Sequence, residues 1–306
     1  MPKPEAWVPL RWQCGPLDTA VLKTPSADTA KVHQAWNDPG RLTLLNGTPI
    51  NCLVVTWAAG RPEDAAQQES LAPLIAAGRA RGIAVVGRIV GDAPAAFATA
   101  KTGGLDAVIA DQVPPNPELP VIGATKIDDF NVRGNTHLVG LSDLPWPQIP
   151  HKPKGGSGGE NAGPTGNPWI DSNGWAIQLS RTLAPDHTPW VMAEPPAEEQ
   201  VFTAESYLVA VCDAAALGAR WPIALDHDLR GQMAAGDPRA LQIWGRITST
   251  QAYFESRRTT LLGQRLVARL GVCSDFTGGN AYLATEFLNL ASRRWLPYRI
   301  LRPRRP

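Results

Sequence analysis

Eight short apolar segments recur along the chain, and their number and spacing constrain the fold more than any other feature of the sequence. Most are rich in valine, isoleucine, leucine or alanine and are bounded by polar or turn-forming residues, which is typical of strands buried on both faces of a parallel sheet. The predicted strands cover residues 8–12, 52–57, 83–89, 107–111, 121–127, 137–141, 190–194 and 221–226.

Helical sequence falls between several of these strands. The expected helices cover residues 62–81, 93–102, 172–183, 203–217 and 238–262. Asp237 can cap the last of them, with Pro238 at its first position. The crossovers after the first and fifth strands are weak, and residues 128–136 are too few for a full helix, so irregular structure is expected there. Alternating strands and helices predict a parallel sheet. Eight strands favour a closed (β/α)8 TIM barrel over an open doubly wound sheet, and no GxGxxG motif follows the first strand.

We assign residues 1–262 to the barrel and residues 263–306 to a short α/β extension. The extension has the pattern of one βαβ unit, with strands at 266–276 and 298–301 around a helix at 280–295. A single βαβ unit cannot cover its own apolar faces. We therefore expect it to dock on the barrel, to pair with another copy of the chain in a homo-oligomer, or to belong to a larger domain.

The charge balance argues against highly charged partners. The 29 lysines and arginines nearly equal the 28 aspartates and glutamates, so neither a nucleic acid nor an acidic membrane surface is expected as a partner. Eleven tryptophans, against six phenylalanines and four tyrosines, favour a carbohydrate partner, because indole faces stack on sugar rings. Core packing is the alternative use of each tryptophan.

No targeting or metal-binding signal stands out. No apolar run is long enough to span a membrane, and the first residues lack the apolar core of a signal peptide. The location stays unknown, and one outside the cytoplasm is expected if a signal peptide preceding Pro2 was removed. The four cysteines are far apart, without a CxxC pair or a neighbouring histidine cluster. Buried free thiols are expected, with no metal site and no cofactor.

Polar side chains stand at the ends of nearly all predicted strands. In a barrel these carboxyl ends converge on one mouth, where substrates bind. Each residue taken alone could equally be a solvated or ion-paired loop residue. The predicted mouth residues are Arg11 or Gln13, Trp57, Arg88, Asp111, Lys126, Asp143, Glu194 and Asp226.

Asp111 and Glu194, after the fourth and seventh strands, are the predicted catalytic pair. Cleavage of a glycosidic bond needs one carboxylic acid to protonate the leaving oxygen and one carboxylate to attack or to activate water. The alternative is that Asp111 caps a turn and Glu194 pairs with Arg88 or Lys126. Asp226 is expected to bind substrate hydroxyls rather than a metal, because no second histidine supports His227 at ligand spacing.

The stretch after the sixth strand offers a lid and a stacking platform. Residues 151–168 are rich in glycine, proline and polar residues, and they are expected to form either a lid over the mouth or a disordered insertion. Trp169 and Trp175 could stack on sugar rings, with Asp171 and Asn173 bonding hydroxyl groups. In the alternative, Trp169 anchors the loop and Asp171 caps the following helix.

Lys126 offers a second reaction class. A lysine at a strand end can form a Schiff base, as in carbon–carbon lyases and aldolases, if burial and cationic neighbours lower its pKa. The alternative is an ion pair between Lys126 and a carboxylate such as Asp111 or Asp143.

The order of these features resembles the barrel glycoside hydrolases whose acid/base and nucleophile follow the fourth and seventh strands. Glu194 in VMAEPP fits the seventh-strand position, whereas Asp111 in VIADQ stands where that family has glutamate. This departure favours the alternative of a barrel that binds carbohydrate without catalysis. The tail, LGVCSDFTGGNAYLATEFLNLASRRWLPYRIL, resembles the opening βαβ unit of the amidotransferase-like domain that follows the barrel in β-galactosidase-type enzymes. The resemblance implies a non-catalytic role in holding subunits together.

Overall fold

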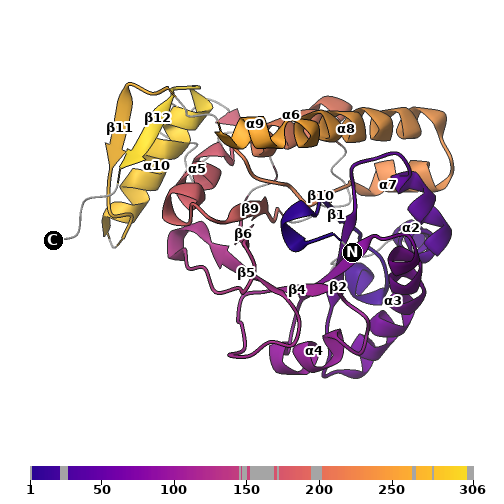
Figure 1. Ribbon diagram of the computed structural model, residues 1–306. Coiled ribbons are helices and arrows are strands. Elements are labelled where there is room, and N and C mark those ends of the chain that lie inside the picture. Colours follow the sequence, from indigo (N-terminus) through magenta and orange to yellow (C-terminus); the bar gives the residue numbers. More distant parts are fainter. Residues whose placement is uncertain are drawn as a thin grey trace, which may run out of the picture.

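The computed structural model describes residues 2–20, 27–144, 146, 150–151, 169–170, 172–193, 202–263, 267–277 and 279–301. Eight parallel strands form one curled sheet, in the order β10-β1-β2-β3-β4-β5-β6-β9, and helices surround it (Figure 1). Each strand overlaps one predicted segment, so the prediction of the strands is confirmed. The strands are β1 (Pro9–Arg11), β2 (Cys52–Trp57), β3 (Ala84–Ile89), β4 (Ala107–Ala110), β5 (Val121–Lys126), β6 (Leu138–Ser142), β9 (Thr188–Val191) and β10 (Ile223–Ala224).

The sheet is barrel-like, but the described strands do not close it with a ladder on every side. β9 and β10 stand at the two ends of the strand order and share only an isolated bridge, between Trp190 and Arg220. The Val191 N–H donates to the Arg220 carbonyl over 2.8 Å. Pro222 has no N–H with which to extend this pairing toward β10. The predicted closed barrel is therefore corrected to a curled parallel sheet of the TIM-like α/β type.

The predicted helices are present with small shifts of their ends. Asp237 caps its helix as expected, because its side chain accepts a 2.8 Å bond from Ala240 N. The expected helix at 238–262 is divided in two at Arg257. The observed helices are α3 (Pro62–Ala80), α4 (Ala93–Ala100), α5 (Gly174–Leu183), α6 (Ala204–Ala216), α8 (Pro238–Ser256) and α9 (Arg258–Gly263).

The crossover after β1 is helical, which corrects the expectation of irregular structure there. It contains α1 (Pro16–Ala20), α2 (Ala27–Asn37) and the 3-10 helix Pro39–Leu45. The sequence signal of α2 is weak because its buried face carries two polar residues: Thr29 and His33 are buried together with Trp36. Sequence reasoning also assigned no helix to α7 (His227–Ala234), and a further 3-10 turn spans Pro4–Ala6.

The crossover after β5 is irregular, as predicted, apart from the 3-10 turn Ile127–Asp129. In this crossover the backbone near Gly134 packs directly against β5. A Cβ atom at Gly123 would lie 2.7 Å from the backbone nitrogen of Gly134, so this contact requires glycine. Asn135 fixes the crossover, since its side-chain Oδ1 accepts a 2.7 Å bond from Val121 N.

Side chains of the sheet alternate between two apolar layers, as the period of a strand requires. Outward side chains such as Leu53 and Val55 pack under the helices. Inward side chains form a separate cluster, whose buried members are Trp7, Cys52, Val54, Ala84, Val86, Ala107, Ile109, Ile122, Leu138, Trp190 and Met192. The next inward positions along the strands carry polar side chains, namely Thr56, Arg88, Lys126 and Ser142. The inner apolar layer therefore gives way to a polar layer at the carboxyl ends.

The C-terminal residues form the predicted βαβ unit. β11 (Leu270–Cys273) and β12 (Tyr298–Leu301) pair in parallel, with α10 (Gly279–Arg293) between them in sequence. The unit docks on α5 beside the curled sheet (Figure 1). Leu179 of α5 shares a buried cluster with Leu288 and Tyr298 of the unit. No helix in the described ranges is long and apolar enough to cross a membrane.

Candidate functional site

The predicted catalytic carboxylates differ in what the structure shows of them. Asp111 follows β4 directly at its carboxyl end and is exposed. Glu194 lies outside the described residues, as does Asp171. The catalytic pair therefore stays a prediction of the sequence. The predicted lid at residues 151–168 lies almost wholly outside the described residues too, flanked by the short antiparallel pair β7 (Pro150–His151) and β8 (Trp169–Ile170).

Lys126 forms an ion pair with Asp143 beyond the end of β5. The hydrogen bond to the Asp143 carboxylate raises the pKa of Lys126, and charge interactions with Asp143 and Asp111 act in the same direction. Both side chains of the pair are more than half exposed, at 67% and 60%. A Schiff-base lysine needs the opposite shift. The geometry thus agrees with the ion-pair alternative for Lys126.

Two predicted stacking residues pack against the core. Trp57 points outward from β2 and is 1% exposed. Its Nε1–H donates to the Ala96 carbonyl of α4 over 3.2 Å, so the ring packs between the sheet and that helix. Trp175 is half-buried and packs against the core from α5, where Asn173 is the buried N-cap residue. Both tryptophans thus serve packing in this structure.

Asp226 is buried and engaged within the fold. One carboxylate oxygen caps α7 by accepting from Leu229 N over 2.9 Å, and the other accepts from the Tyr207 hydroxyl over 2.7 Å. Tyr207 in turn accepts from the Asp226 N–H. Burial raises the pKa of the Tyr207 phenol well above its usual value, so the hydroxyl stays a donor. The side chain predicted to bind hydroxyls therefore holds β10, α6 and α7 together.

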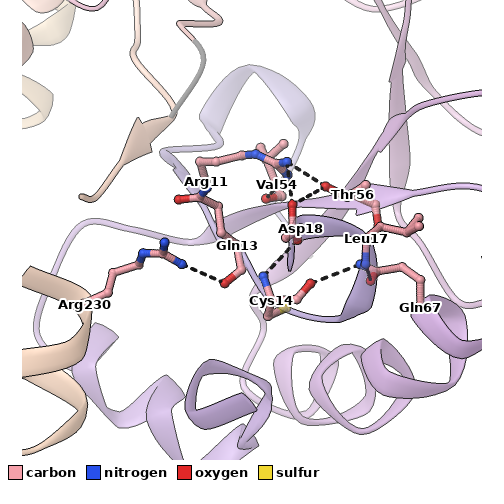
Figure 2. A network of polar contacts seen from close by, with 9 residues as sticks. All are labelled: Arg11, Gln13, Cys14, Leu17, Asp18, Val54, Thr56, Gln67 and Arg230. Atoms are coloured by element: carbon pink, nitrogen blue, oxygen red, sulfur yellow. Dashed lines mark hydrogen bonds and ion pairs between the residues drawn. The ribbon is translucent and has the colours of Figure 1, made fainter. Parts of the chain in front are cut away.

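A buried polar network lies at the carboxyl ends of β1 and β2 (Figure 2). It contains Arg11, a predicted mouth residue, whereas sequence reasoning missed its other side chains, Asp18, Thr56 and Gln67. Arg11 donates to Asp18 over 3.2 Å and to the Thr56 hydroxyl over 2.7 Å. The same Asp18 oxygen accepts from Thr56 over 2.7 Å. The other oxygen of Asp18 accepts from the Cys14 N–H over 2.9 Å. This carboxylate therefore ties the loop after β1 to both strands.

Gln67 of α3 completes the network from the helix side. Its amide nitrogen donates to the carbonyls of Cys14 and Thr56, over 3.1 and 3.2 Å, and its Oε1 accepts from Leu17 N over 3.0 Å. Burial raises the pKa of the Cys14 thiol well above its usual value. Cys14 is therefore a protonated, unreactive thiol. The network fixes the shape of this side of the mouth rather than supplying a reactive group.

Basic side chains lie next to this network. His33 of α2 is 2% exposed and Arg230 of α7 is 5% exposed. Arg230 Nη1 donates to the Gln13 carbonyl over 3.2 Å (Figure 2). Burial lowers the pKa of His33 to about 3, and the charges of Arg230 and His227 act in the same direction. Burial likewise lowers the pKa of Arg230 to about 10, which leaves it charged at neutral pH.

The low pKa of His33 predicts a loss of stability in mild acid. The folded protein holds His33 neutral, whereas the unfolded chain takes up a proton near its ordinary pKa of 6.5. The contribution of neutral His33 to the free energy of unfolding is therefore fully present above pH 6.5, and it is lost progressively as the pH drops toward 3. We expect the free energy of unfolding of His33→Gln, measured with urea at pH 8 and pH 5, to change less between the two pH values than that of the parent. Equal changes in the variant and the parent would contradict the lowered pKa of His33.

Comparisons with known proteins add no family assignment, because no family model matches this sequence and no curated protein matches it. In the described part of the chain, no group of three or more histidine, cysteine, aspartate or glutamate side chains is arranged to hold a metal ion.

Proposed function

We propose that the chain is a glycoside hydrolase that acts on an oligo- or polysaccharide at the carboxyl end of the curled sheet, with Asp111 and Glu194 as its carboxylate pair. The observation that carries the proposal is the polar layer above the apolar interior of the sheet. Asp111 belongs to the same end and is exposed to an incoming ligand. Substrate-binding surfaces of barrel-like α/β proteins lie at this end of the sheet.

The roles of the two carboxylates follow from the chemistry of acetal cleavage. One, as an acid, protonates the leaving glycosidic oxygen, and the other attacks the anomeric carbon or removes a proton from water. Arg88 and the ion pair between Lys126 and Asp143 are proposed to bond sugar hydroxyls beside Asp111. The charge of Asp111 is among those that raise the pKa of Lys126.

The test is release of reducing ends from a panel of oligosaccharides by the purified chain. We expect Asp111→Asn and Glu194→Gln each to lower kcat by about 10²- to 10⁴-fold, the usual contribution of a general acid or base. Glu118→Gln is the matched control. Glu118 is an exposed carboxylate ahead of β5, paired with Lys101 at 3.0 Å, at the opposite end of the sheet. Its activity should equal that of the parent.

Two results would decide against hydrolysis by this pair. Full activity in both variants would show that other groups carry out the reaction. Sugar binding without turnover in the parent would support the alternative of a barrel that binds carbohydrate without catalysis.

Self-association through the C-terminal unit is a further part of the proposal. It is supported by exposed apolar side chains of this unit, among them Val267, Tyr282, Leu283 and Trp295. Sedimentation of the full chain measures the self-association.

A further inference from the structure

Two helices bring three basic side chains together beside the network at the carboxyl ends of β1 and β2. His33 belongs to α2, and His227 and Arg230 belong to α7. The two helices approach closely because α7 carries a glycine at their contact: a Cβ atom at Gly231 would lie 3.2 Å from Cγ2 of Val32. The helices α2 and α7 are in contact, and the charges of Arg230 and His227 both lower the pKa of His33.

Two polar atoms of the α7 side chains in this cluster are buried without a partner among the described residues. Within the described residues, Nε of Arg230 and Nδ1 of His227 make no hydrogen bond, although both atoms are inaccessible to solvent. Arg230 donates from Nη1 to a backbone carbonyl, that of Gln13, rather than to a carboxylate. The guanidinium therefore keeps its Nε–H donor without an acceptor among the described residues.

The two carboxylates that act on Arg230 from a distance are occupied elsewhere. Asp18 accepts from Arg11, Thr56 and the loop backbone, and Asp226 accepts from Tyr207 and from the first turn of α7. A buried guanidinium without a direct anionic contact loses its hydration without full compensation. In native proteins a buried donor left unpaired calls for a specific partner.

We propose that Arg230 and His227 bind the anionic group of a charged sugar, so that the substrate class is an acidic oligosaccharide carrying a carboxylate, sulfate or phosphate group. This inference rests on the proposed function and places a second sugar residue beside β1 and β10, away from Asp111. A neutral hydroxyl could bond the free Nε–H but could not balance the charge of the guanidinium. The planar donor edge of arginine is suited to two oxygens of one anion.

The experiment measures the binding of four single sugars to the full chain by calorimetry: glucose, glucuronate, glucose 6-sulfate and glucose 6-phosphate. We expect at least one anionic sugar to bind about tenfold or more tightly than glucose, since charge-assisted bonds are worth that much. The three anions distinguish a carboxylate from a sulfate or phosphate ester. Equal affinity for all four sugars would overturn the inference.

Arg230→Lys keeps the charge and removes the two-donor edge. We expect it to reduce the preference for the anionic sugar about tenfold, whereas Arg239→Lys, on the exposed surface of α8, should leave the preference unchanged. An unchanged preference in a folded Arg230→Lys variant would overturn the inference. If that variant does not fold, the ring resonances of His33 and His227 in the parent protein decide. They should shift with the anionic sugar and stay in place with glucose, and the absence of any shift would count against the site.

Failure of this inference can be told apart from failure of the proposed function. Repeating the titrations with Asp111→Asn measures binding without turnover. Hydrolysis of neutral oligosaccharides with no preference for anionic sugars would overturn the anion subsite alone. Arg230-dependent preference for an anionic sugar in a chain without hydrolytic activity would support the subsite and reject the hydrolase.

Discussion

Arg220→Met is expected to lower the free energy of unfolding by about 3 to 5 kcal/mol, the usual cost of removing one partner of a buried ion pair. The Arg220 guanidinium forms two bonds to Glu255 of α8, at 2.9 and 2.7 Å, and one to the Glu5 carbonyl at 2.6 Å. Side-chain exposures of 6% and 18% leave little water to replace them. Urea unfolding measures the loss.

The matched control for Arg220 is Arg246→Met. Arg246 joins the same helix to Glu205 of α6 at 2.9 Å, but both side chains are about half exposed or more. Such surface pairs contribute about 0 to 1 kcal/mol. A double variant, with Arg220 and Glu255 both replaced by apolar residues, should recover part of the loss. A loss below about 1 kcal/mol in Arg220→Met would show that this pair does not join α8 to the sheet in the way described.

Asp18→Asn is expected to cost a similar amount, about 3 to 5 kcal/mol, because it leaves the buried Arg11 without its counter-charge. The amide also brings an NH2 group to a place where Thr56, Arg11 and the Cys14 N–H all donate. At least one of these donors then loses its acceptor. Thermal and urea unfolding of the variant measure the cost.

Asp28→Asn is the control for Asp18. Asp28 lies in α2 and pairs with Lys31 at 3.2 Å, with side-chain exposures of 81% and 76%. Its replacement should change stability by less than about 0.5 kcal/mol. If both variants lose the same small amount, the network at the ends of β1 and β2 contributes no more to stability than an ordinary surface contact.

The strands could be predicted because their signal is local. Continuous apolar runs such as residues 52–57 identify buried strands without knowledge of their neighbours. The helix α2 could not be found in this way, since its buried Thr29 and His33 interrupt the apolar pattern. These side chains are buried where α2 packs against other helices, α7 among them, and the local sequence does not show that packing.

The site was harder to predict because a strand that is apolar on both faces does not show which side chains point inward. Trp57 and Thr56 are neighbours at the end of β2, and a shift of one residue exchanges their faces. The sequence predicted that Trp57 faces the mouth. In the structure Thr56 points inward and joins the network, whereas Trp57 points outward and packs against α4. The one polar side chain in the segment CLVVTW, Thr56, was the signal that could have identified the inward face.

The position of β1 has a consequence for how the chain folds during synthesis. β1 lies between β2 and β10, with Leu10 opposite Ile223, so its second neighbour is made only near the end of the sheet-forming sequence. Contacts this distant along the chain slow folding. Until β10 arrives, one edge of β1 remains a template for pairing with other chains. We expect the nascent protein to be most vulnerable to aggregation in this interval, when most of the sheet has been synthesised but β1 has not yet paired with β10.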